Sequence, residues 1–300
     1  MKDSHGTTSS TSSEKPTEDP HCTVTSIYQA KIGDVCRNVT VVWGKNLMNH
    51  TLILTVHSPH SDQHSTCKID LKPWHFWNKK GFKSFDVDGK RINVFWDLRV
   101  AKFSGRSEPS SDYYVAMVCD EEVVLLLGDY KKEAYKRSKS RPSLINATLV
   151  SKKENVFGKR SFSARAKFDE KKDHEILIEN SISMATESDM WISIDGIVMI
   201  HVNNLQWKFR GNQTVTVNEI PVQVFWDVHD WLFSGPGMVH ALFIFKPGQP
   251  AQLPGQDGED DGSDHGSRVS DGDGGYDGCL ARNHGVQPGF SLFLYAWKVD

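Results

Sequence analysis

The chain has 300 residues, of which 38% are hydrophobic and 24% are charged, and its formal net charge at pH 7 is -3. This composition is typical of a globular protein and allows one large domain or two of ordinary size. It excludes a chain that crosses a membrane on helices, because no apolar run approaches the ~20 residues that such a helix needs.

Two segments lack the apolar residues that a core requires. Residues 1–20 are rich in Ser and Thr and have no secretory signal, and Gly248 to Gly278 carries eight acidic residues against the single base Arg268. We expect both segments to be disordered. The Asp and Gly spacing of the second segment lacks the closing Glu of a calcium loop, so no metal is expected there.

The five cysteines are widely spaced and form no CxxC pair. Because the sequence shows no leader peptide, we expect reduced thiols and a cytoplasmic or nuclear protein that is not secreted.

Between these segments the apolar residues alternate with polar ones, which is typical of β-strands. In the first half we expect strands at Val39 to Trp43, Leu52 to Val56, Cys67 to Leu71, Lys83 to Val87, Ile92 to Trp96, Tyr113 to Val118 and Val123 to Leu127. In the second half we expect them at Ser161 to Phe168, Glu175 to Glu179, Met190 to Ile194, Val198 to Val202, Gln206 to Phe209, Thr214 to Val217, Val222 to Trp226, Val239 to Phe245 and Ser291 to Trp297. Asp88-Gly89 and Asp195-Gly196 predict two-residue hairpin turns.

An internal repeat appears when the chain is compared with itself at an offset of 130 residues, which places Trp77 to Gly105 over Trp207 to Gly235. The identical pairs are Trp77/Trp207, Gly81/Gly211, Val87/Val217, Val94/Val224, Phe95/Phe225, Trp96/Trp226, Asp97/Asp227, Phe103/Phe233, Ser104/Ser234 and Gly105/Gly235. The repeat predicts an all-β protein of two tandem sandwich-like or barrel-like units. We place these units at 21–128 and 143–300, joined by a basic connector at 129–142.

The repeated Phe-Trp-Asp sequence provides one hypothesis for a catalytic site. Asp97 and Asp227, with Arg99 and His229, could converge between the two units as an acid and a base. The alternative interpretation is structural, with each Asp ending a strand and capping the turn that follows.

A histidine-rich loop provides a hypothesis for a metal site. His57, His60, His64 and Cys67 have donor atoms that zinc prefers. No second CxxC or HxxxH element accompanies them, so an ordinary polar loop, with Cys67 beginning a strand, is the preferred interpretation, and we expect no cofactor.

The basic connector contains a pattern for phosphorylation. Arg137 precedes Ser140 by three residues, and Arg137, Ser138, Ser140 and Pro142 together resemble the phosphopeptide pattern that 14-3-3 proteins bind. The alternative is a solvated turn or short helix between the units. Because the basic run is short, the sequence does not favour nucleic-acid binding.

The nine tryptophans divide into two expected groups. Trp43, Trp96, Trp191, Trp207, Trp226 and Trp297 lie in strand patterns, and we expect them in the core. Trp74, Trp77 and Trp231 fall in expected loops, where they could line a partner surface.

Several segments together resemble a plant family, the domain of unknown function 868. They are the sequences from Cys67 to Trp77, Val94 to Gly105, Glu121 to Arg137, Met190 to Gly196, Leu205 to Val215 and Val222 to Gly235, and the likeness covers about Cys36 to Lys246 and Ser291 to Lys298. The resemblance implies a plant protein. It carries over no reaction, cofactor or catalytic residue.

From these observations we expect a binding or scaffolding protein with protein partners, which include a 14-3-3 protein through phosphorylated Ser140, and with no membrane insertion. The alternative is an enzyme of unfamiliar type whose site lies at the seam between the repeats.

Overall fold

The computed structural model describes residues 22–46, 49–58, 64–71, 79–168, 172–182, 188–235, 237–248 and 289–299. The tail expected at 1–20, and all but Gly248 of the loop expected at 248–278, lie outside these residues. Strands account for nearly all of the regular structure in the described residues, and only two short helices accompany them. The prediction of an all-β protein is therefore confirmed.

The first half of the chain contains β1 (Cys22–Ile32), β2 (Val35–Lys45), β3 (His50–His57), β4 (His64–Leu71), β5 (Lys80–Val87), β6 (Lys90–Asp97), β7 (Tyr114–Cys119), β8 (Glu122–Gly128), α1 (Lys131–Ser138) and β9 (Arg141–Pro142). The second half contains β10 (Thr148–Gly158), β11 (Ser161–Ala166), β12 (His174–Asn180), β13 (Met190–Ile194), β14 (Ile197–Val202), β15 (Arg210–Val217), β16 (Ile220–Asp227), α2 (His229–Phe233), β17 (Val239–Pro247) and β18 (Ser291–Lys298).

Three sheets build two layered units, each around its own apolar core. A nine-stranded sheet has the order β15-β16-β17-β18-β10-β1-β2-β3-β4, and the two smaller sheets are β5-β6-β7-β8-β9 and β11-β12-β13-β14. The first core lies between β1–β4 and β5–β8, and the second lies between β11–β14 and β15–β18. Since no sheet of the described residues closes on itself, the units are sandwich-like, and the barrel-like alternative is wrong.

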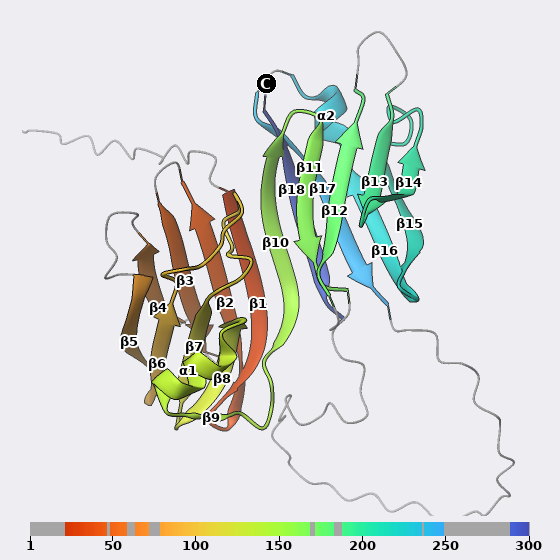
Figure 1. Ribbon diagram of the computed structural model, residues 1–300. Helices are drawn as coiled ribbons and strands as arrows, with labels where there is room; N and C mark the ends of the chain where they lie inside the picture. Colours follow the sequence, from red (N-terminus) through yellow and green to blue (C-terminus); the bar gives the residue numbers. More distant parts are fainter. Residues whose placement is uncertain are drawn as a thin grey trace, which may run out of the picture.

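The two units meet where β1 pairs with β10, as Figure 1 shows near the middle of the molecule. Val24 of the first core pairs with Glu154, and Glu154 pairs with Leu294 of the second core. Because directly paired residues of a sheet point to the same face, both cores lie on one side of the nine-stranded sheet. The opposite side of this sheet is its outer face.

The two hairpins of the internal repeat, β5–β6 and β15–β16, pair their strands in the same register. Gly81 of β5 lies opposite Trp96 of β6, and Gly211 of β15 lies opposite Trp226 of β16. A Cβ atom on Gly81 or Gly211 would meet the partner indole at 2.5 or 2.3 Å. The repeat therefore preserves a glycine because a tryptophan ring lies flat across it.

Both predicted Asp-Gly turns are confirmed. Asp88 and Gly89 have φ values of 45° and 78°, and Asp195 and Gly196 have values of 51° and 79°. Positive φ at both central residues is the geometry that a two-residue hairpin of this type requires.

The segment 129–142 contains a short helix, as one interpretation of it predicts, and this helix, α1, packs on β7 through Ala134, while β9 pairs with β8. Two expectations about local structure are wrong. Gln206 to Phe209 forms a turn instead of a strand. Among the cysteines, Cys36 is disulfide-bonded, whereas Cys22, Cys67 and Cys119 are free thiols.

The glycine and tryptophan pairs yield a first prediction. Gly211→Ala should lower the free energy of unfolding by ~1 to 3 kcal/mol, because the new methyl group forces the Trp226 ring out of place. Gly235→Ala is the matched control, since no atom lies within 4 Å of its added Cβ. Denaturant unfolding of both variants tests this, and equal stability would contradict the contact.

Candidate functional site

The repeated aspartates are held by their own hairpins. Arg99 donates to both carboxylate oxygens of Asp97, at 2.9 and 2.8 Å, and Lys80 lies 3.1 Å away. In the second copy Arg210 donates to Asp227 at 2.8 Å, and the backbone N–H of His229 donates to it at 3.1 Å.

These contacts place the two aspartates in a structural role. Burial raises the pKa of Asp97, but the hydrogen bonds from Arg99 and Lys80 outweigh it and hold the pKa below its ordinary value. Asp97 and Asp227 belong to different sheets, and no hydrogen bond or ion pair of the described residues joins them. The structure therefore does not bring the four proposed catalytic residues together.

The seam between the units is filled by charged side chains that pair with one another. Lys152 of β10 lies 2.9 Å from Glu108 and 3.9 Å from Glu154, and Arg106 lies 3.6 Å from Glu154. Burial lowers the pKa of Lys152, but Glu108 and Glu154 outweigh it and raise the pKa, so this ammonium stays charged. The seam thus joins the units with an ion network.

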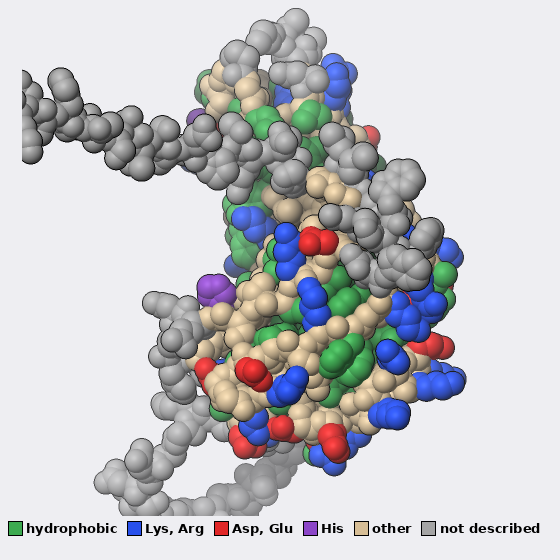
Figure 2. Space-filling model, turned by 90° about the vertical axis from the view of Figure 1, so that its left-hand side faces the viewer, with side chains coloured by type: hydrophobic (Ala, Val, Ile, Leu, Met, Phe, Trp, Pro, Cys, Tyr) green, Lys and Arg blue, Asp and Glu red, His purple; other side chains and the backbone are tan. Residues whose placement is uncertain are grey.

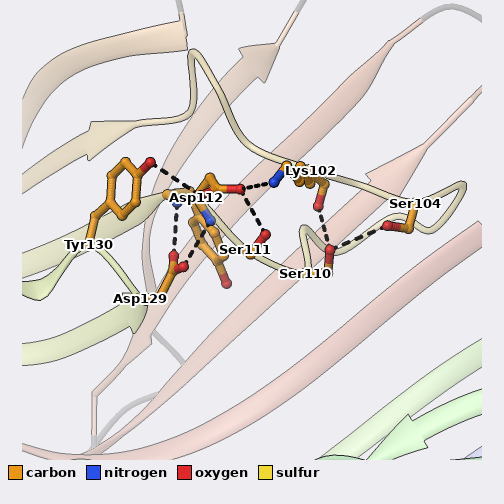
Figure 3. Close-up of polar contacts among 8 residues, drawn as sticks. Lys102, Ser104, Ser110, Ser111, Asp112, Asp129 and Tyr130 are labelled. Carbon is orange, nitrogen blue, oxygen red and sulfur yellow. Dashed lines mark hydrogen bonds and ion pairs between the residues drawn. The ribbon is translucent and has the colours of Figure 1, made fainter.

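A polar cluster anchors the loop that carries Arg106 and Glu108 to this seam. Figure 3 shows the carboxylate of Asp112 accepting from Lys102 at 2.8 Å, Ser111 at 3.0 Å and Tyr130 at 3.2 Å. Asp129 accepts from the backbone N–H groups of Asp112 and Tyr113, both at 3.1 Å. The cluster fixes the left-handed backbone of Asp112, whose φ is 63°, and thereby the course of the loop.

The proposed metal ligands lie on opposite faces of their strands. His57 and His64 pair on the outer face, with ring centroids 6.3 Å apart, whereas Cys67 is buried in the first core. His60 lies outside the described residues. Within the described residues no group of three or more His, Cys, Asp or Glu side chains could hold a metal ion.

The proposed phosphorylation site is part of the folded first unit. Ser138 is the last residue of α1. The hydroxyl of the half-buried Ser140 donates to the Ser138 carbonyl at 3.2 Å. The backbone N–H of Arg141 donates to the backbone carbonyl of Glu121 at 2.9 Å. Arg137 and Pro142 are exposed. A 14-3-3 protein binds an extended segment, so recognition here would require β9 and the end of α1 to detach.

The end of the first unit that Figure 2 presents carries lysine and arginine side chains among acidic ones. Several bases of the first unit are paired, as in Lys90 with Asp120 at 2.8 Å and Lys68 with Asp70 at 3.6 Å. Nucleic-acid binding proteins instead concentrate unpaired bases along one stripe. The mixed charges and these ion pairs therefore do not favour nucleic-acid binding.

Two tryptophans exchange their expected places. Trp231, expected at a partner surface, is 4% exposed, and its indole N–H donates to the Ala296 carbonyl at 3.0 Å. Trp207, expected in the core, is 83% exposed in the turn before β15. Trp191 and Trp297, also expected in the core, are both half-buried instead. Trp74 and Trp77 lie outside the described residues.

The outer face of the nine-stranded sheet carries a patch of half-buried apolar side chains in the second unit. We call this patch the aromatic face, and it consists of Phe157 of β10, Phe225 of β16, Leu242 and Ile244 of β17, and Phe293, Tyr295 and Trp297 of β18. This patch was not predicted from the sequence. The pattern that could have indicated it is that β17 and β18 carry large apolar residues at both the inward and the outward positions.

The strand register places these side chains next to one another. Phe225, Ile244 and Phe293 form one row across three strands. Phe157 stacks on Trp297, with ring centroids 6.3 Å apart and an interplanar angle of 14°.

Two exposed lysines border the aromatic face. The ammonium of Lys153 lies 4.4 Å from the ring centroid of Tyr295, and that of Lys246 lies 5.5 Å from the ring centroid of Phe225. Each position suits a cation–π contact. The aromatic face thus combines apolar rings with a positively charged border.

The exchange of the two tryptophans yields a prediction. Trp231→Ala should lower the free energy of unfolding by ~3 to 5 kcal/mol, because it empties a packed site. Trp207→Ala should change it by less than ~0.5 kcal/mol, because the ring lies in solvent. Denaturant unfolding measures both, and a large loss from Trp207→Ala would show that this ring is packed.

The seam yields a third prediction. Lys152→Met should cost ~3 to 5 kcal/mol, because it leaves Glu154 and Glu108 without their shared cation. The double variant Lys152→Met with Glu154→Leu should recover most of that loss, since an apolar pair then replaces the ions. A double variant as unstable as the single one in thermal unfolding would argue against this view of the seam.

Comparisons with known proteins agree with the resemblance seen in the sequence. A family model described as plant protein of unknown function, DUF868, matches residues 19–298. No curated protein and no solved structure matches the chain. None of the helices in the described residues has the length and apolar character to cross a membrane. The match covers most of the chain, which therefore belongs to the DUF868 family of plant proteins.

Proposed function

We propose that this protein is a binding module that recognises a partner protein through the aromatic face. The observation that carries the proposal is a difference between the two units. In the first unit α1 packs on the outer face of β7, and every residue of β7 is buried. In the second unit the equivalent strand, β17, is buried at alternate positions, and its outward side chains are half-exposed.

An apolar surface of this kind is typical of interfaces. Isolated exposed apolar residues are common on proteins, but a contiguous patch with a polar border marks a contact site. Aromatic side chains contribute most to binding energy when a partner excludes water from them. The aromatic face has five such rings on β10, β16 and β18, and they are Phe157, Phe225, Phe293, Tyr295 and Trp297.

The charged side chains that an enzyme could use for proton transfer are held in ion pairs, which supports a binding role for the protein over a catalytic one. Asp97 is paired with Arg99 and Lys80, and Lys152 is paired with Glu108 and Glu154. An acid or base that transfers protons needs a substrate within hydrogen-bond reach and a pKa near the working pH. The hydrogen bonds on Asp97 move its pKa away from that range.

Selection of a displayed random peptide library against the full chain tests the proposal. Peptides that bind the wild type should lose at least about tenfold in affinity, ~1.4 kcal/mol, for the variant Phe293→Thr with Tyr295→Thr. The matched control is Val42→Thr with Ile53→Thr, which alters outward positions of the same sheet in the first unit.

Circular dichroism first establishes that both variants fold. Peptides that bind the wild type and the Phe293→Thr, Tyr295→Thr variant equally would contradict the proposal, and so would a failure to select any peptide.

A further inference from the structure

The internal repeat allows the aromatic face to be compared residue by residue with a face that already has an occupant. Phe95 pairs with Ala116 and Ala116 with Leu126 in the first unit. Phe225 pairs with Ile244 and Ile244 with Phe293 in the second. Because Phe95 and Phe225 are identical positions of the repeat, the two rows are equivalent.

The occupant of the first face is a helix of this chain. α1 packs on Tyr114, Ala116 and Val118 through Ala134, which is fully buried, with Tyr130 and Tyr135 at its sides. No helix of the described residues lies on the equivalent face of β16, β17 and β18.

From this comparison we infer that the aromatic face binds an acidic amphipathic α-helix of a partner protein, placed across β16–β18 as α1 is placed across β6–β8. The inference rests on the proposed function and specifies the partner. Binding of an amphipathic helix through its apolar side is an established mode of recognition.

The size of the side chains indicates what the apolar side of that helix carries. At the centre of the strand that α1 covers, the first unit has the small residue Ala116. The equivalent position of the aromatic face is Ile244. Because Ile244 extends further from the sheet than Ala116 does, a helix at the same distance as α1 has room only for a small side chain above it, so we expect Ala or Gly there.

The charges at the border indicate what the opposite side of the helix carries. Lys153 and Lys246 are exposed, and neither forms an ion pair within the described part of the chain. The one acid on this part of the sheet, Asp227, is paired with Arg210 at 2.8 Å. Carboxylates on the helix would give both lysines a partner, whereas a basic helix such as α1, with Lys131, Lys132, Lys136 and Arg137, would be repelled.

Stapled helical peptides of roughly 15 residues test the inference, because unstapled ones of this length are only marginally helical. The first peptide has a central Ala stripe and Glu on its polar side, and the second has Lys in place of every Glu. A third keeps the acidic composition but contains a central Pro. Fluorescence anisotropy with the full chain should show the acidic helix binding at least about tenfold more tightly than either control, a difference of ~1.4 kcal/mol.

Charge reversal on the protein sharpens the test. Lys153→Glu with Lys246→Glu should weaken binding of the acidic helix at least about tenfold and strengthen binding of the basic one. Lys131→Glu with Lys132→Glu changes the net charge equally on the exposed side of α1 and should leave both affinities unchanged. Zero-length cross-linking of the bound acidic helix should join its carboxylates to Lys153 and Lys246.

The inference would be overturned by equal binding of the acidic and basic helices, or by charge reversal that changes neither affinity. It would also be overturned if the chain itself occupies the aromatic face. The signs of this are self-association that is lost in the Phe293→Thr, Tyr295→Thr variant, or cross-links from Lys153 or Lys246 to acidic residues of the same chain.

The peptide library separates the inference from the proposed function. Selected peptides that bind this face but are basic or extended would overturn the inference while leaving the proposed function intact. If no selected peptide depends on Phe293 and Tyr295, the proposed function itself fails.

Discussion

The architecture depends on the pairing of β1 with β10. Each repeat contains enough strands for a sandwich, yet the hydrogen bonds from Val24 to Gln29 along β1 join the first meander to the second and produce one nine-stranded sheet. A β-sheet edge has unpaired donors and acceptors, so joining two edges satisfies both at once. The same pairing places both cores on one side of the sheet and leaves the other side as a single outer face.

The strands that form this junction carry polar residues at some of the inward positions where other strands have apolar ones. At the inward positions that face the seam, β1 has Ser26 and β10 has Lys152 and Glu154, so the two cores do not merge. A buried ion network costs desolvation energy and is satisfied only in one geometry. The network therefore adds a second set of contacts between the units to the β1–β10 pairing, and the loop held by Asp112 and Asp129 brings Arg106 and Glu108 into it.

The two repeats share a framework and differ in what lies on it. The Gly-Trp pair and the Asp that follows recur in both copies, and in each copy the Asp accepts a hydrogen bond from the backbone N–H two residues later. The outer faces of the two copies differ. α1 turns the outer side of β7 into a third small core, whereas the equivalent side of β17 and β18 keeps its rings half-exposed. The proposals above follow from this difference.

The sequence by itself determined the strand content, the repeat and the Asp-Gly turns, because alternation, identity at a fixed offset and turn chemistry are local properties. It did not reveal β1 or β10, since polar residues at inward positions, Ser26 in β1 and Lys152 and Glu154 in β10, weaken the alternation there. It also misplaced Trp207, Trp231 and Trp297, because an apolar residue in a short segment does not indicate whether a neighbouring element will cover it. The covering of a sheet face depends on contacts between residues far apart in the chain, such as Ala134 on Ala116 or Trp231 on Ala296. Only the tertiary structure therefore decided which outer face is closed by α1 and which remains open as the aromatic face.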